Sequence, residues 1–217
     1  LRGVARRVFR GGPLLTRLLQ HHRPTICPFH ELLRYVPTDA RVLDIGCGGG
    51  LLLALLAATR SPSELTGIDS SRRAIAVAQA NLERFGMPLP RLFLLDANAP
   101  WPVDGQGGYD TVILCDVLHH VPAAAQRLLL ERAGAAVAPG GVLVYKDIYP
   151  EGLVRPNASR LHDLLIARER IAIPRIADVV GAVTGAGLGL EHVQRINMLW
   201  YGHELAVFRR PAVAAEA

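Results

Sequence analysis

The fold of this 217-residue chain is decided by the stretch Arg41-Val42-Leu43-Asp44-Ile45-Gly46-Cys47-Gly48-Gly49-Gly50. Its first half is an apolar run that is typical of a buried strand, and the leucine-rich segment 51–58 that follows is typical of a helix. The glycines stand where the chain must reverse, and glycine permits positive φ angles and a close approach of the backbone to a ligand. This stretch therefore predicts a ligand-binding turn between a strand and a helix.

Strand and helix patterns alternate through the rest of the chain, which indicates a parallel sheet covered by helices on both faces. We expect strands at 41–46, 64–69, 91–95, 109–115, 141–147, 188–196 and 200–209, and helices at 50–60, 71–85, 122–137, 157–170 and 174–184. Pro139-Gly140-Gly141 should form a turn before the fifth strand. No helix fits between the last two strands, so they should pair as an antiparallel hairpin. The predicted class is α/β: a doubly wound, Rossmann-like, seven-stranded sheet, mostly parallel with an antiparallel edge hairpin.

Residues 1–40 do not follow this alternation. An Arg-rich amphipathic stretch covers 1–22, and a short helix is expected between Pro24 and Pro37. We interpret 1–40 as an N-terminal helical cap over the carboxyl edge of the sheet, within the same domain as the rest. A helix that only pads the domain, or one that makes peripheral contact with a membrane surface, remains the alternative.

The composition is that of a folded protein, with 50% hydrophobic and 20% charged residues. The longest unbroken apolar run, 51–58, is shorter than the ~20 residues that a transmembrane helix needs. The three cysteines, Cys27, Cys47 and Cys115, include no C-x-x-C pair, which favours neither a disulfide framework nor a zinc site. We therefore expect a cytoplasmic protein without a transmembrane segment or a bound metal.

The net charge of +5 raises the question of a nucleic-acid partner, because a basic surface attracts phosphate groups. The chain holds 23 arginines and one lysine, and the arginines are scattered rather than gathered into one stripe. Aromatic residues make up 6% of the chain and are not interleaved with the arginines. We therefore expect a small-molecule substrate rather than nucleic acid. No pattern in the sequence indicates an oligomeric state.

The spacing of the glycines distinguishes two classes of ligand. A dinucleotide fingerprint reads G-x-G-x-x-G, and counting from Gly46 places Leu51 at its third glycine. Asp44, at the end of the strand, also argues against a bound pyrophosphate, because a pyrophosphate prefers the positive end of a helix without an adjacent carboxylate. A sulfonium with an amino-acid tail carries positive charge and tolerates an acid nearby. The turn therefore favours a sulfonium over a dinucleotide.

The segment VLDIGCGGG at 42–50 resembles the first motif of the class I methyltransferases that depend on S-adenosylmethionine (SAM). The resemblance covers residues 41–209 and implies a SAM-binding methyltransferase domain, which we place at 41–217. It also implies that the turn holds the methionine part of SAM. The cofactor-binding residues expected in this segment are Asp44, Gly46, Cys47, Gly48 and Gly50.

Acids at the ends of the next two strands supply the further contacts expected with SAM. Asp69 ends the second strand, and a carboxylate there can accept hydrogen bonds from both ribose hydroxyls. Ser70 or Ser71 should cap the following helix, and we place Ser70 among the residues around the cofactor. Resemblance to the family's third motif implies that Asp96 accepts from the adenine amino group and that Ala97 offers its backbone N–H.

The segment 109–120 runs from a buried strand into the loop where this family places its chemistry. The resemblance implies that the backbone carbonyl of Cys115 holds the amino group of SAM, that Asp116 lines the pocket and that one histidine points to the substrate. Methyl transfer to a hydroxyl requires alignment and removal of a proton, which a neutral imidazole can accept. We favour His120 over His119 as general base. The alternative is that both only pack or cap the next helix.

Lys146 ends the fifth strand and is the third catalytic candidate. A single lysine among arginines suggests that a compact ammonium is needed there, with chance retention as the alternative. Lys146-Asp147, together with Leu161-His162-Asp163 in an expected helix, resembles a subgroup of small bacterial methyltransferases.

Several methyltransferase signatures are absent from the sequence. It has no N/D-P-P-Y/F motif for amino groups of DNA bases, no Pro-Cys pair for cytosine C5 methylation and no carboxylate cluster spaced as in magnesium-dependent catechol enzymes. We predict metal-independent methyl transfer from SAM to a small, mostly apolar metabolite at an oxygen atom. The alternatives are a methyltransferase acting on RNA or protein and a SAM-binding protein without catalytic activity.

Overall fold

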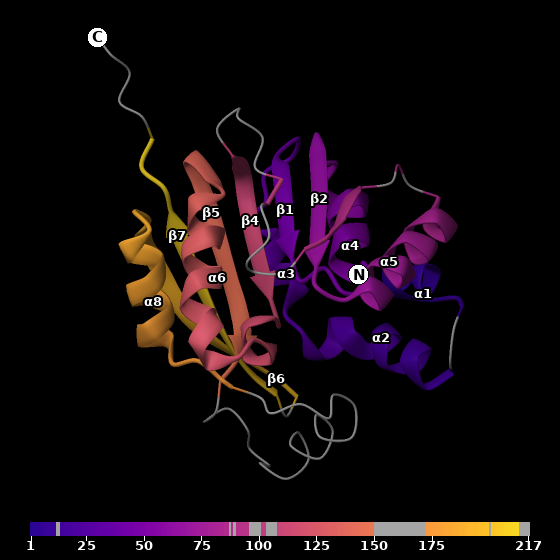
Figure 1. Cartoon of the computed structure of the whole chain (residues 1–217). Helices are drawn as coiled ribbons and strands as arrows, with labels where there is room; N and C mark the ends of the chain where they lie inside the picture. Colours follow the sequence, from indigo (N-terminus) through magenta and orange to yellow (C-terminus); the bar gives the residue numbers. More distant parts are fainter. Residues whose placement is uncertain are drawn as a thin grey trace.

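The computed structural model describes residues 1–11, 14–86, 88, 90–95, 101–102, 108–149, 172–199 and 201–212. They form a seven-stranded sheet of order β3-β2-β1-β4-β5-β7-β6 with helices on both faces (Figure 1). The strands are β1 (Arg41–Ile45), β2 (Glu64–Asp69), β3 (Arg91–Leu94), β4 (Tyr109–Cys115), β5 (Val137–Ile148), β6 (Gly189–Met198) and β7 (Tyr201–Arg209). The predicted α/β class is confirmed. The strand order reverses between β1 and β4, and such sheets bind ligands at this point, outside the carboxyl ends of the strands.

The direction of the strands changes at β7. The pairs from β3 across to β5 are parallel, whereas β7 is antiparallel to both of its neighbours, β5 and β6. The predicted antiparallel hairpin at the edge is therefore confirmed. Because β7 and not β6 lies beside β5, the last strand of the chain becomes an interior strand of the sheet.

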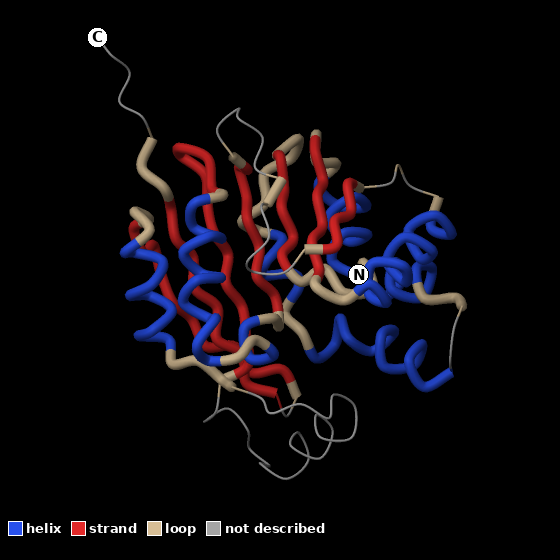
Figure 2. The backbone as a smooth tube through the Cα atoms, in the orientation of Figure 1, coloured by secondary structure: helices blue, strands red, loops and turns tan. Residues whose placement is uncertain are grey.

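Helices cover both faces of this sheet (Figure 2). One apolar cluster joins α1, α3, α4 and α5 to one face, and a second joins α6 and α8 to the other. Four predicted helices are confirmed with ends shifted by one or two residues, and the helix predicted at 157–170 lies outside the described residues. No helix in the described ranges has the length and apolar character that crossing a membrane requires. The helical elements are α1 (Arg2–Val8), α2 (Leu14–Ile26), α3 (Phe29–Leu33), α4 (Leu51–Arg60), α5 (Arg72–Phe85), the 3-10 turn η1 (Leu118–His120), α6 (Ala123–Ala135) and α8 (Ile176–Gly185).

β1 and α4 anchor the turn between them in the core. Residues 42–45 of β1 are all buried, as expected for a parallel strand covered on both faces. Residues 51–56 of α4 are buried without interruption, so the first turns of this helix are enclosed on every side. The glycine turn is therefore held in place at both of its ends.

β5 begins earlier than the sequence predicts. The turn expected at Pro139-Gly140-Gly141 is a bulge inside the strand, because Tyr109 pairs with Val137 whereas Thr111 pairs with Val142. Two steps along β4 thus correspond to five along β5. Gly140 has a φ of 76°, and its N–H donates to the carbonyl of Arg210 over 3.1 Å instead of to β4. The turn residues therefore distort the strand without ending it.

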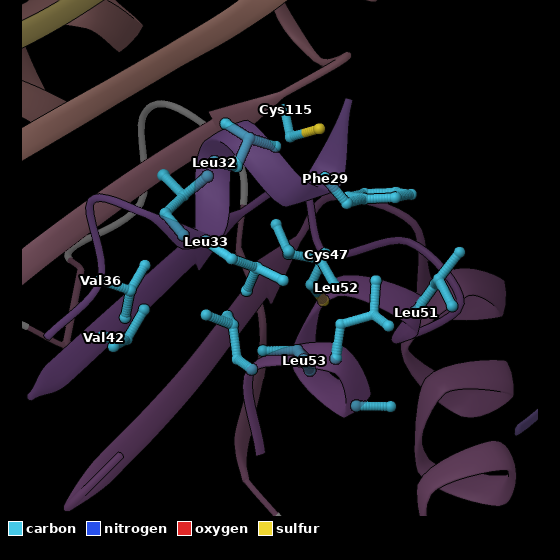
Figure 3. Packing of buried hydrophobic residues seen from close by; sticks show 14 of the residues in the cluster. Phe29, Leu32, Leu33, Val36, Val42, Cys47, Leu51, Leu52, Leu53 and Cys115 are labelled. Carbon is cyan, nitrogen blue, oxygen red and sulfur yellow. The ribbon is translucent and has the colours of Figure 1, made fainter. Parts of the chain in front are cut away.

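Helices also form in the predicted cap. α2 runs below the carboxyl ends of the parallel strands in Figure 1. α3 belongs to the same apolar cluster as the glycine turn and α4, and Figure 3 shows its side chains Phe29 and Leu32 beside Cys115 and Leu52. The cap therefore shares a core with the sheet, while the division of the chain at residue 40 stays a prediction.

Candidate functional site

The glycine turn lies at the switch point of the sheet, and its backbone is left-handed at alternate residues. Gly46 and Gly48 have φ angles of 72° and 53°. A Cβ atom at Gly46 would lie 2.4 Å from Cγ2 of Val117, so the position excludes a side chain. A Cβ atom at Gly48 would meet no atom within 4 Å. The backbone at Gly48 therefore borders open space, as a ligand-binding turn must.

The carboxylate of Asp69 connects this turn to the end of β2. The N–H of Gly48 donates to Oδ2 over 2.9 Å, and the N–H of Ser71 donates to Oδ1 over 2.8 Å. Ser71 also caps α5, because its Oγ accepts from the N–H of Ala74, whereas Ser70 is exposed. Each carboxylate oxygen has a second lone pair, so Asp69 can also accept hydrogen bonds from a ligand.

Asp44 is a buried acid beside the turn. Its side chain is 2% exposed, and Oδ2 has no hydrogen-bond partner among the described residues. Burial, and then the charge of Asp69, raise the pKa of Asp44 to about 8. A cation placed next to this carboxyl would lower its pKa and favour the ionised form. Asp44 is therefore suited to a positively charged ligand.

A cavity of about 50 Å³ lies between the glycine turn and the cap. Arg23 of α2 is the cationic side chain in its wall. Pockets that enclose a small molecule usually measure ~300–1,000 Å³, so this cavity by itself holds only part of a ligand of nucleoside size. The residues that line the cavity are Gln20, Arg23, Phe29, Asp44, Gly46, Cys47, Gly48, Gly49, Leu51, Leu52 and Cys115.

Two cations meet one carboxylate next to this cavity. Lys146 is fully buried and its ammonium donates to Oδ1 of Asp116, while the guanidinium of Arg23 donates to Oδ2 over 3.2 Å. Burial opposes ionisation of Asp116, but the charges of Lys146 and Arg23 outweigh it and hold the pKa of Asp116 far below its usual range. The three side chains thus form an ion cluster that joins α2 to the ends of β4 and β5.

The corner between α2 and α3 closes over this cluster. Sγ of Cys27 lies 3.9 Å from Sγ of Cys115 and 3.7 Å from Oδ2 of Asp116. Nε2 of His203, on β7, donates to the carbonyl of Ile26 over 2.6 Å. Burial, and then the charge of Lys146, lower the pKa of His203 to about 4, so its ring is neutral at pH 7. The cap is therefore attached to two strands by polar contacts.

The donor atoms of Cys27, Cys115 and Asp116 lie within 4.8 Å of one another, a spacing that could hold a metal ion. Arg23 and Lys146 already contact the carboxylate, however, and both would repel a further cation. Metal-independent chemistry stays a prediction.

The two candidate histidines lie near the far side of β5, because successive residues of a strand point to opposite faces and Asp147 follows Lys146. Nδ1 of His119 contacts Oδ1 of Asp147, and the N–H of His119 donates to Oδ2 over 3.2 Å. His119 is buried, whereas His120 is exposed, and their ring centroids lie 4.0 Å apart. Asp147 therefore orients His119, which packs against His120.

The structure brings most of the predicted cofactor residues together. Gly50 is the N-cap residue of α4, between Gly49 and Leu51 of the cavity wall, and Asp69 contacts the turn. Lys146 reaches the cavity through Asp116 and Arg23, whereas His119 and His120 are not part of its wall. Asp96, Ala97, His162 and Asp163 lie outside the described residues. The roles of all these residues stay predictions.

Sequence reasoning missed three side chains that surround this site: Arg23, Cys27 and His203. No local sequence motif indicates these residues, because their positions depend on how the cap and β7 pack onto the rest of the sheet. The sequence signal for Arg23 was its positive charge. This signal did not single it out, because the chain contains many other arginines.

Comparison with known sequences finds similarity to methyltransferases. A family model described as a methyltransferase domain matches residues 43–143. The chain is 36% identical over 108 residues to a ubiquinone biosynthesis O-methyltransferase of Azorhizobium caulinodans, covering 50% of this chain and 40% of that protein. It is 31% identical over 156 residues to a trans-aconitate 2-methyltransferase of Delftia acidovorans, covering 71% and 53%. The chain thus spans about half the length of the curated relatives it matches.

Solved structures share the fold at lower identity. The magnesium protoporphyrin IX methyltransferase of Synechocystis PCC 6803 with bound SAM has a TM-score of 0.65 at 18% identity, over 96% of this chain and 90% of that one. An O-methyltransferase family protein from Burkholderia thailandensis has a TM-score of 0.68 at 20% identity, over 91% and 58%. The cyclase SpnF has a TM-score of 0.67 at 15% identity, over 89% and 82%. At such identities the likeness concerns the fold alone.

Proposed function

The chain belongs to the class I family of SAM-dependent methyltransferases, and from this premise we propose that it methylates an oxygen atom of a small, mostly apolar molecule. The observation that carries the proposal is the open side of the turn at Gly48, flanked by the carboxyl groups of Asp44 and Asp69. A dinucleotide site can also use an acid such as Asp69 for a ribose, but Asp44 beside the turn would repel an anionic pyrophosphate and attract a cationic cofactor.

The residues around the cavity match the parts of SAM in charge. When bound, SAM supplies a methyl group on a positively charged sulfur. Asp69 accepts hydrogen bonds from the ribose, and Asp44 faces the positive charge of the methionine part. Arg23 pairs with the carboxylate of that part, since it is the cation in the described cavity wall. Arg23 can turn from Asp116 to the cofactor because Lys146 continues to neutralise Asp116.

Proton removal from the acceptor is assigned to the histidines of η1. His120 is the proposed general base because it is exposed to an arriving acceptor, and His119 is a positioning residue held by Asp147. With Nδ1 of His119 donating to the carboxylate, its Nε2 carries the lone pair, so His119 is the second candidate for the base. Lys146 is likewise a positioning residue, because its buried ammonium is bound to Asp116.

The name of one relative supports oxygen as the atom that receives the methyl group. This relative is named a ubiquinone biosynthesis O-methyltransferase, and another is named a trans-aconitate 2-methyltransferase. The matched parts of these proteins include the cofactor turn but only about half of their length. The identity of the acceptor is therefore left to experiment.

A second candidate function is a SAM-binding protein with another activity or none. The likeness to SpnF favours it, because that protein shares the fold and is named a cyclase rather than a methyltransferase. Incubation with methyl-labelled SAM and small-molecule extracts, followed by mass identification of labelled products, separates the candidates. A labelled small molecule whose yield survives a chelator supports the proposal. Label in RNA or protein alone, or no label despite SAM binding, contradicts it.

A further inference from the structure

Two buried thiols face each other across the boundary between the cap and the sheet. Cys27 lies between α2 and α3, and Cys115 ends β4. Their sulfur atoms are 3.9 Å apart, and the side chains are 2% and 8% exposed. The third cysteine, Cys47, is buried in the glycine turn. Cys27 and Cys115 are thus placed to react with each other.

The charges around this pair favour its chemistry. Burial and the charge of Asp116 raise the pKa of Cys27, but the hydrogen bond with Cys115 and the charges of Lys146 and Arg23 outweigh them and lower it. The pKa of Cys115 is raised by its hydrogen bond to Cys27 and by burial. Cys47 differs, because burial and the charge of Asp44 raise its pKa. Because positive charges favour a thiolate, we assign Cys27 as the attacking thiol and Cys115, whose sulfur lies 3.9 Å away, as the thiol that reacts with its oxidised form.

We propose that Cys27 and Cys115 form a peroxide-oxidised site, in which a disulfide ties the α2–α3 corner to β4 and holds the cap closed over the cofactor cavity. The thiolate of Cys27 attacks hydrogen peroxide, the O–O bond breaks, and a sulfenic acid forms as hydroxide leaves. The sulfur of Cys115 then attacks that sulfur, the S–O bond breaks, and water leaves. Two thiols and one peroxide give one disulfide and two waters, so two electrons pass from sulfur to oxygen.

The geometry requires a small movement of the cap. A disulfide has a sulfur–sulfur distance of about 2.05 Å, so the 3.9 Å separation must shorten while the rest of the corner stays in place. Figure 3 shows Cys115 near the cap residues Phe29 and Leu32, and Cys27 belongs to the same apolar cluster. His203 already holds this corner through the carbonyl of Ile26. The bond would therefore tighten an existing attachment.

The consequence for the cofactor rests on the proposed function. Gln20 and Arg23 of α2 and Phe29 of α3 lie on either side of Cys27 and form the cap side of the cavity at the glycine turn. In this proposal the wall moves outward when SAM enters. A covalent link between Cys27 and β4 lowers the fraction of open molecules, and apparent affinity falls in proportion to that fraction.

The test compares the reduced full chain with the same protein after treatment with hydrogen peroxide. Each sample is denatured, alkylated and analysed by mass, and the native samples are examined by amide hydrogen exchange and SAM titration. The oxidised protein should carry one alkyl group, on Cys47, and a Cys27–Cys115 peptide that dithiothreitol releases. Exchange at 20–33 should slow, and SAM should bind about tenfold or more weakly through loss of the open state. Cys27→Ala should show neither change.

Three outcomes would overturn the inference: free thiols at Cys27 and Cys115 after peroxide, oxidation of Cys27 beyond the disulfide as the main product, or a disulfide that leaves both hydrogen exchange and SAM affinity unchanged. A reduced protein that binds no SAM contradicts the proposed function instead. The mass and hydrogen-exchange results decide the inference in that case, because neither needs the cofactor.

Discussion

The backbone N–H of Gly48 donates to Oδ2 of Asp69 over 2.9 Å and thereby ties the turn after β1 to the carboxyl end of β2. This bond fixes the spacing between the two elements that the cofactor has to bridge. The same carboxylate shapes the turn and offers further lone pairs to a ligand. A change at Asp69 should therefore weaken cofactor binding.

Replacing Asp69 by alanine should weaken SAM binding by about 1.5–3 kcal/mol, because hydrogen bonds to a charged acceptor are lost. Titration calorimetry measures the difference. Asp110→Ala is the matched control, since this acid pairs with Arg41 over 2.9 Å at the amino end of β1 and should not affect SAM. Equal SAM affinities for Asp69→Ala and the wild type would remove Asp69 from the site.

Replacing Asp44 by asparagine should stabilise the unliganded protein at pH 7 while weakening SAM. The folded pKa of about 8 lies above the ordinary 3.8, so the buried carboxyl reduces stability progressively as pH rises from 4 to 8. The gain at pH 7 is on the order of 2–4 kcal/mol, at about 1.36 kcal/mol per pKa unit. Urea unfolding across this window should show wild type and variant converging toward pH 4. A difference that does not vary with pH would contradict the buried acid.

The same acid predicts how SAM binding depends on pH. If the ionised form of Asp44 faces the cation, the affinity of the wild type relative to Asp44→Asn should increase from pH 6 to pH 8. The ratio of the two affinities removes the titration of SAM itself. A ratio that stays constant over this range would show that Asp44 does not respond to the cofactor.

Replacing Lys146 by methionine should lower the free energy of unfolding by about 2–4 kcal/mol, because Asp116 keeps only the partly exposed Arg23 as counter-charge. Arg127→Met is the control, since Arg127 pairs with Glu131 on the surface of α6 and should matter by about 0.5 kcal/mol or less. Denaturant unfolding of both variants measures the contrast. Similar losses in the two would contradict a buried ion cluster.

Replacing His120 by alanine should reduce turnover by about 10²–10⁴-fold while leaving SAM affinity close to that of the wild type. Wild-type turnover should also fall at acidic pH, where the imidazolium cannot accept a proton. His119→Asn separates the two histidines, because its amide N–H can replace Nδ1 beside Asp147 but offers no basic nitrogen. Near-normal turnover in His119→Asn is expected. A large loss there, with normal turnover in His120→Ala, would move the base to His119.

The sequence was a good guide wherever local pattern decides structure. The glycine turn, the acid of Asp69 and the alternation of strands and helices are local features, so they could be placed without coordinates. The bulge at Gly140 could not, because a Pro-Gly-Gly segment reads as a turn until β4 and β7 pair around it. Lys146 stood out by its rarity, but its partners Asp116 and Arg23 meet it only through the packing of α2 on the sheet.

Titration of the full chain with SAM, and separately with NAD, tests the central claim of a sulfonium cofactor at the Gly46–Gly50 turn most directly. The account predicts one SAM molecule bound per chain with micromolar affinity, and much weaker binding of NAD, because Asp44 lies beside a turn that lacks the third glycine of a dinucleotide site. Tighter binding of NAD than of SAM, or no binding of SAM by the reduced protein, would contradict it.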